Sequence, residues 1–347
     1  MPRRSEIGGD LALALILPVR ELEHPALGAG EPSDVARMIR LAKRAGCVST
    51  ETWPVSTLKD LRHLPTHTDI AALARRCASF FTRDPRVRAT AIVGSVARGI
   101  TDACSDVDTL IYLDGPLLEA ETDELRRCAE ARGGQAYPPS KDSFVFYQIV
   151  EGVKCDFGFS PVSCMERALR AVLDERSTDP IHHELIAGIL EALPVHGGAL
   201  IEGWQRRARS YPEPLAHAMI EKHMKLVPRW VIEEMCVRRG DLPFLYECLL
   251  ESQRRILALL AAVNRIYRPA KLKGAMHLVP RFEHAPERTL ERLNALLSTP
   301  PERVPEPYTR LAEDCFEVVA KREPAVDLEP AREHFALAFS HGPAPRL

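Results

Sequence analysis

Hydrophobic positions in the first half of the chain show both helical and strand-like spacing. Apolar residues recur every three to four positions over 69–81 and 116–131, which predicts two helices. Short apolar runs at 89–93, 107–113, 143–150 and 153–159 predict strands. Only Glu151-Gly152 separates the last two runs, and a two-residue connection with glycine in second place is typical of a hairpin. Residues up to about 160 are therefore predicted to form helices packed on a small mixed sheet.

Strand-like patterns fade after Pro161, and helical spacing takes over. Helix-like segments separated by proline and glycine occupy 163–174, 181–192, 199–209, 214–239, 242–266, 286–297, 306–321 and 329–339. Pro228 is expected to kink or divide the longest of them. The pattern predicts an α+β fold: an N-terminal extension at 1–65 with a helix over 34–45, an α/β domain with a small mixed sheet at 66–175, and a mostly helical domain at 176–347.

Composition narrows the class of protein. The 347 residues include 46 Lys and Arg against 48 Asp and Glu. This balance argues against a protein that binds nucleic acid through the phosphate backbone, which needs an excess of basic residues. The nine cysteines are an odd number without a CxxC motif, as expected for reduced thiols in a cytoplasmic protein. No apolar run approaches the ~18 residues of a membrane span, so no membrane partner is expected.

The stretch from Gly94 to Gly99 carries the first chemical signal. Gly94 ends a predicted strand, and Ser95 follows where a helix can begin, so backbone N–H groups and the serine hydroxyl can face an anion. Arg98 can offer two parallel hydrogen bonds to phosphate oxygens. A strand-to-helix turn that needs glycine only for its geometry is the alternative.

Three aspartates carry the second signal. Asp106 and Asp108 lie two positions apart at the start of a predicted strand, so their side chains share one face, ~6 to 7 Å apart along the backbone. Like charges held this close favour a bridging divalent cation, although a solvated acidic turn is the alternative. Asp156 interrupts an apolar strand, where a charged group needs a partner. If its strand lies beside that of Asp108, the three carboxylates converge and can hold two Mg²⁺ ions ~3.5 to 4 Å apart.

Taken together, these motifs resemble a known family. The segment 94–99 (Gly-Ser-Val-Ala-Arg-Gly), the pair Asp106 and Asp108 after the five-residue spacer and Ser105, and the later Asp156 resemble the signature of the nucleotidyltransferase superfamily. That superfamily includes DNA polymerase β and the minimal and antibiotic (aminoglycoside- and lincosamide-type) nucleotidyltransferases. The resemblance covers about residues 85–160. It implies a polymerase β-like fold, with Gly94 and Ser95 at the triphosphate and the three aspartates at the metals.

The resemblance also implies a reaction. We expect transfer of a nucleoside monophosphate from an NTP to a hydroxyl of a small-molecule acceptor, with Mg²⁺ as cofactor, Mn²⁺ as the alternative metal, and pyrophosphate as the second product. Asp106, Asp108 and Asp156 would be catalytic and metal-binding, and either Asp156 or another carboxylate would take the proton of the acceptor hydroxyl. A protein or RNA-end acceptor, and a non-catalytic, antitoxin-like nucleotide-binding module, are the alternatives. The preferred nucleobase of the NTP stays open, as does the choice between monomer and homodimer.

Overall fold

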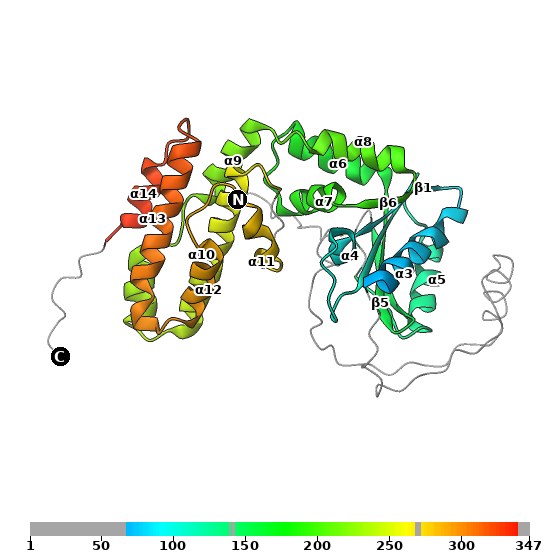
Figure 1. The fold of residues 1–347 in the computed structure, drawn as a ribbon, viewed down its shortest axis with the longest axis horizontal. Helices are drawn as coiled ribbons and strands as arrows, with labels where there is room; N and C mark the ends of the chain where they lie inside the picture. Colours follow the sequence, from blue (N-terminus) through cyan, green and yellow to red (C-terminus); the bar gives the residue numbers. More distant parts are fainter. Residues whose placement is uncertain (1–66, 139, 141–142, 268–271, 339–347) are drawn as a thin grey trace, which may run out of the picture.

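The computed structural model describes residues 67–138, 140, 143–267 and 272–338. The predicted helix at 34–45 lies outside these residues, as does nearly all of the N-terminal extension. The described chain forms a half that contains a β-sheet and a half built from helices. They are joined along the top of Figure 1 by α6 (Val162–Leu173), α8 (Gly198–Ala208) and α9 (Glu213–His223). This mixed architecture confirms the predicted α+β class.

The sheet is mixed and has six strands among the described residues. Its order is β3-β4-β5-β2-β1-β6, in which β2 and β5 run parallel and all other neighbours run antiparallel. The strands are β1 (Val87–Val93), β2 (Val107–Leu113), β3 (Gln135–Ala136), β4 (Phe144–Val150), β5 (Val153–Pro161) and β6 (Leu193–His196). The sequence pattern predicted β1, β2, β4 and β5 but neither of the two shortest strands.

The hairpin between β4 and β5 has the predicted turn. Glu151 has a φ of 53° and Gly152 a φ of 79°, so both turn residues are left-handed, as a type I′ turn requires. The turn sets the register that pairs Val150 with Val153 and, further along, Tyr147 with Asp156. The position of Asp156 within the sheet therefore follows from this local turn.

Two layers of helices cover the sheet. One face packs against α3 (His67–Phe80) and α5 (Glu119–Glu130), whose Leu73 and Ala129 share a core with Ile111 and Phe157. The other face packs against α6 (Val162–Leu173) and α8 (Gly198–Ala208), where Trp204 meets Tyr112 with ring centroids 4.8 Å apart. Both layers are visible in Figure 1. Successive residues of β2 enter different cores, which fixes the side of the sheet on which Asp108 lies.

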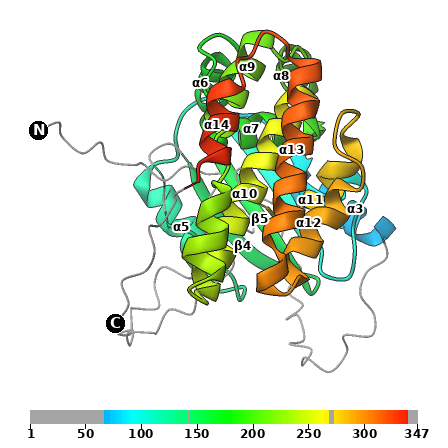
Figure 2. The same cartoon turned by 90° about the vertical axis from the view of Figure 1, so that its left-hand side faces the viewer.

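The helical half is built around one long buried helix, α10 (Leu242–Val263). Pro228 lies between α9 (Glu213–His223) and a π-helical segment at Val231–Val237, so it divides the predicted segment. The view in Figure 2 shows α10, α12 (Thr289–Ser298), α13 (Pro305–Arg322) and α14 (Glu329–Ala336) side by side. The remaining helices among the described residues are α4 (Gly94–Arg98), α7 (Pro180–Leu190) and α11 (Ala275–Leu278), with 3₁₀ turns at Phe81–Arg83, Val279–Arg281 and Pro301–Arg303.

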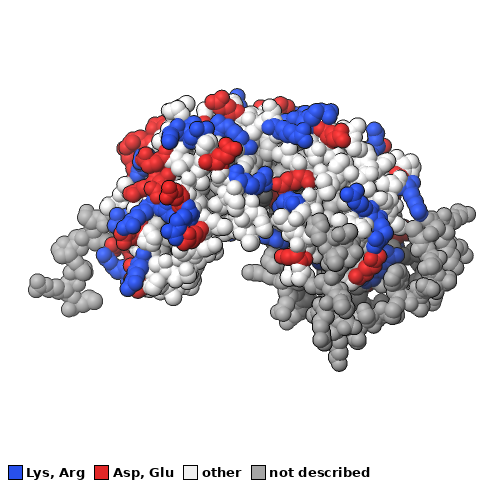
Figure 3. All heavy atoms as spheres, in the orientation of Figure 1, with Lys and Arg blue, Asp and Glu red and all other residues white. Residues whose placement is uncertain are grey.

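The surface and the cysteines agree with the composition. Basic and acidic side chains intermingle over the face drawn in Figure 3, which is hollowed between the two halves. The eight cysteines that the structure describes are free. Within the described ranges, no helix combines the length and the apolar character needed to cross a bilayer.

Buried His183 gives the fold a predictable response to acid. The side chain lies in α7 with 0% of its surface exposed, and Nε2 donates to the Ser177 carbonyl at 3.0 Å. Burial lowers the pKa of His183 to about 4, from an ordinary value of 6.5. Between pH 6.5 and about 4, His183 is therefore protonated in the unfolded chain but neutral in the folded chain. Stability should fall as the pH drops from 6.5 toward 4.

Urea denaturation measures this effect. We expect His183 to account for a loss of about 2 kcal/mol of unfolding free energy between neutral pH and about pH 5. His183→Phe should lack this part of the acid response, whereas His277→Gln, at an exposed position of α11, should keep it. An equal acid response in wild type and His183→Phe would contradict the assignment.

Candidate metal and nucleotide site

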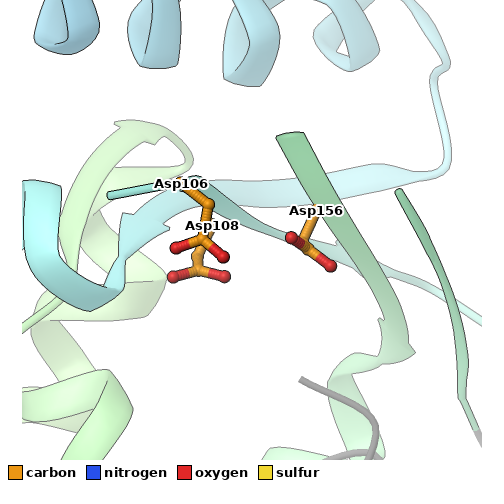
Figure 4. A group of neighbouring side chains, drawn as sticks. All are labelled: Asp106, Asp108 and Asp156. Atoms are coloured by element: carbon orange, nitrogen blue, oxygen red, sulfur yellow. The ribbon is translucent and has the colours of Figure 1, made fainter. Parts of the chain in front are cut away.

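Three carboxylates meet where β2 and β5 run side by side. The parallel register places Asp108 directly opposite Asp156, and Asp106 immediately precedes β2. Cys155 and Phe157 enter the core under α3, so Asp156 between them points to the other side of the sheet. Figure 4 shows all three side chains on that side, and one oxygen from each lies within 4.8 Å of the others. The predicted convergence is confirmed.

The site crowds negative charge into a region partly closed to water. The Asp156 side chain is only 1% exposed, whereas that of Asp106 is 37% exposed. Burial, followed by the charges of Asp106 and Asp156, raises the pKa of Asp108 to about 7. Burial also raises the pKa of Asp156, against the opposing effect of Lys154. A cation bound among these oxygens would relieve the repulsion between the carboxylates, which adds to burial in raising the pKa of Asp108 and of Asp156.

The donor set suits a hard divalent cation. Carboxylate oxygens are the preferred protein ligands of Mg²⁺ and Mn²⁺, and the three lie close enough to share an ion. A positive group already lies among them, because Lys154 Nζ donates to Asp156 Oδ2 and lies 3.5 Å from Asp106 Oδ2. The residues therefore fit a divalent metal ion, and the geometry alone does not choose the element.

Two aromatic residues complete the surroundings of Asp156. Tyr137, which directly follows β3, donates its hydroxyl to Asp156 Oδ1 at 3.0 Å. Burial and the neighbouring Asp156 charge raise the pKa of Tyr137 to about 12. Tyr147 of β4 pairs with Asp156 in the sheet, and its ring centroid lies 5.1 Å from Lys154 Nζ. Both oxygens of Asp156 are thus held in place by neighbours.

Gly94 brings the backbone of the turn against Asp108. Its φ is 71°, and a Cβ at this position would collide with Asp108 Oδ2. Glycine is therefore needed both for its backbone conformation and for the close approach. Gly94 begins the short helix α4 (Gly94–Arg98), and Ser95 follows it. Among the described residues, the buried Ser95 Oγ has no hydrogen-bond partner, so a ligand oxygen would satisfy it.

Arg98 ends α4 and contacts the helical half. Its guanidinium lies 3.7 Å from Glu191 Oε2, and the other oxygen of Glu191 binds Arg281 at 2.6 Å. Binding of phosphate by Arg98 stays a prediction. The charge of Lys273, from the segment after α10, opposes the rise in the pKa of Asp108 that burial and the other carboxylates cause, so the helical half also places positive charge near the carboxylates.

Sequence reasoning missed Lys154 and Tyr137. Lys154 lies two positions before Asp156 on the same strand, so strand parity alone places the two side chains on one face. Tyr137 carried no such signal, because its contact depends on where β3 and the residue after it lie in the sheet.

Comparisons with known proteins return few matches. No family model matches the chain, and no curated protein matches it. One of the solved structures that match is a nucleotidyltransferase-like protein from Exiguobacterium sibiricum 255-15. The two proteins are 11% identical in sequence, and the match covers 74% of this chain and 77% of the Exiguobacterium protein, with a TM-score of 0.39.

Proposed function

We propose that this chain is a metal-dependent nucleotidyltransferase. It transfers a nucleoside monophosphate from an NTP to a hydroxyl of a small-molecule acceptor and releases pyrophosphate. The observation that supports this proposal is the convergence of Asp106, Asp108 and Asp156 across the parallel strands β2 and β5. The Ser95 hydroxyl in the adjoining turn, which has no hydrogen-bond partner in the part of the chain that the structure describes, is a further support.

The residues divide the work of the reaction. Asp106, Asp108 and Asp156 would hold Mg²⁺, or Mn²⁺ in its place, and the bound metal supplies Lewis-acid stabilisation of phosphoryl charge. Asp156 accepts the proton of the acceptor hydroxyl as the new O–P bond forms at the α-phosphorus and the bond to pyrophosphate breaks. Ser95 Oγ donates to a phosphate oxygen, and Arg98 adds a positive charge at the same turn.

The proposed acceptor is a small molecule for electrostatic reasons. The chain has 46 basic and 48 acidic residues, and both signs mix over the surface in Figure 3. A long polyanion would need a basic surface to bind well at physiological salt. We assign nucleotide binding to residues 66–175 and acceptor binding to residues 176–347, from which Glu191 contacts Arg98 and also pairs with Arg281.

The proposal predicts a measurable transfer reaction. The full chain, incubated with one NTP at a time, Mg²⁺ and a small-molecule extract of cells, should release pyrophosphate. Mass spectrometry should find an acceptor heavier by one nucleoside monophosphate. Omitting Mg²⁺ or adding excess EDTA should abolish both signals, since the carboxylates alone cannot neutralise phosphoryl charge.

One control variant and two further outcomes test this reaction against its alternatives. Asp156→Asn should bind nucleotide but transfer it poorly, because the amide accepts no proton. Transfer only to macromolecules would replace the small-molecule acceptor with a protein or RNA end. Nucleotide binding without pyrophosphate release, for every NTP and extract, would contradict the enzymatic proposal and favour a regulatory nucleotide-binding module.

A further inference from the structure

Lys154 lies inside the carboxylate cluster rather than beside it. Its ammonium is hydrogen-bonded to Asp156 Oδ2 and 3.5 Å from Asp106 Oδ2, so it bridges the first and third aspartates of the trio. These carboxylates come from β5 and from the residue before β2. The contact therefore ties together the two strands that build the site.

The surroundings of Lys154 favour a fixed cation. Its side chain is 37% exposed, and the ammonium lies over the ring of Tyr147 on the neighbouring strand. An aromatic face attracts a cation through its quadrupole. Tyr137 holds the opposite oxygen of Asp156, which leaves Oδ2 directed at Lys154. Carboxylate, carboxylate and ring thus surround the ammonium within one sheet.

The net charge of the three carboxylates and the Lys154 ammonium matches a single divalent ion. Asp106, Asp108 and Asp156 together carry three negative charges when ionised, and the ammonium neutralises one of them. The remaining two match one divalent cation. A second divalent ion at the same oxygens would have to displace a positive group that is covalently attached to β5 and already paired.

We propose that Lys154 is a tethered cation that takes the place of one metal ion, so that the trio binds one divalent cation instead of two. The inference rests on the proposed function only through its metal site. It revises the expectation of two ions that the carboxylate trio alone suggests. Lys154 acts here as a positioning residue, because it sets the charge and the orientation of Asp156 and Asp106.

Mn²⁺ binding to the full, nucleotide-free chain tests this inference. Titration followed by the electron paramagnetic resonance signal of free Mn²⁺ counts bound ions, and only ions lost in Asp108→Asn are assigned to the site. We expect one ion per wild-type chain, one for Lys154→Arg, which keeps the charge, and two for Lys154→Met. Lys321→Met, which removes the same charge at an exposed position of α13, should leave the count at one.

Each outcome has a distinct meaning. Equal counts for wild type and Lys154→Met, or two ions in wild type, would overturn the tethered cation and leave the proposed function intact. No site-specific ion in any of these chains would contradict the metal site and with it the proposed function. If circular dichroism shows that Lys154→Met is unfolded, the wild-type count decides: one ion supports the inference and two overturn it.

Discussion

Asp108→Asn should lower nucleotidyl transfer by about 10³-fold, the scale of losing a central electrostatic group in an active site. Asp108 is the middle carboxylate of the trio: it faces Asp156 across the strands and lies against the backbone of Gly94. An amide keeps its size but supplies no negative charge for a metal ion. The rate of pyrophosphate release, measured at saturating NTP and Mg²⁺, reports the loss.

The same substitution should leave the fold intact. Burial and two like charges raise the pKa of Asp108, so the carboxylate is held in an unfavourable place in the metal-free chain. Its neutral replacement should therefore keep or raise the melting temperature without metal. Asp114→Asn is the matched control, because Asp114 follows the far end of β2 and pairs at the surface with Arg88. Full activity of Asp108→Asn would remove the trio from the reaction.

Long, regularly patterned elements were predictable because their burial follows the pattern of the residues themselves. β2 begins and ends at the predicted residues, and its buried positions enter the cores on both sides of the sheet. β6 was missed because its Leu193 is 41% exposed and it has only four residues, so no periodicity marks it as a strand. It is a strand only because β1 offers it hydrogen-bonding partners. Long-range pairing of this kind leaves no local trace.

The carboxylate trio was predictable for a different reason. A strand alternates its faces, so the positions of Asp106, Asp108 and Asp156 in apolar runs fixed their sides once the strands were neighbours. That β2 and β5 are neighbours had to be assumed, and the sheet order supplies it. Lys154 lies on the same face of its strand as Asp156. Its role was not predictable, because a lysine in a strand is interpreted as solvated unless the sheet order shows that two carboxylates lie beside it.

The motif predicted only part of the structural role of Gly94. A glycine before a serine at a strand end, taken alone, favours a purely geometric turn over a phosphate turn. The structure adds a contact from more than a dozen positions away, in which the absent side chain makes room for Asp108 Oδ2. Gly94 therefore has two roles, the backbone conformation of the turn and the space for Asp108, and an experiment can separate them.

Gly94→Ala should reduce transfer by about 10²-fold, because its Cβ must push the carboxylate of Asp108 out of place, and small misplacements at a reacting centre have effects of that size. The left-handed backbone adds about 1–2 kcal/mol of destabilisation. Gly99→Ala is the matched control, since Gly99 has a φ of 68° and a Cβ there meets nothing within 4 Å among the described residues.

Both alanine variants therefore carry a similar backbone strain, and only one of them disturbs a carboxylate. Both melting temperatures should fall, and further in Gly94→Ala because its Cβ also displaces Asp108. Gly99→Ala should keep transfer within about threefold of wild type, as expected when strain is confined to a turn. Mn²⁺ affinity should weaken in Gly94→Ala alone. If the two variants lose activity equally, the turn acts through its shape, and the contact between Gly94 and Asp108 has no part in the chemistry.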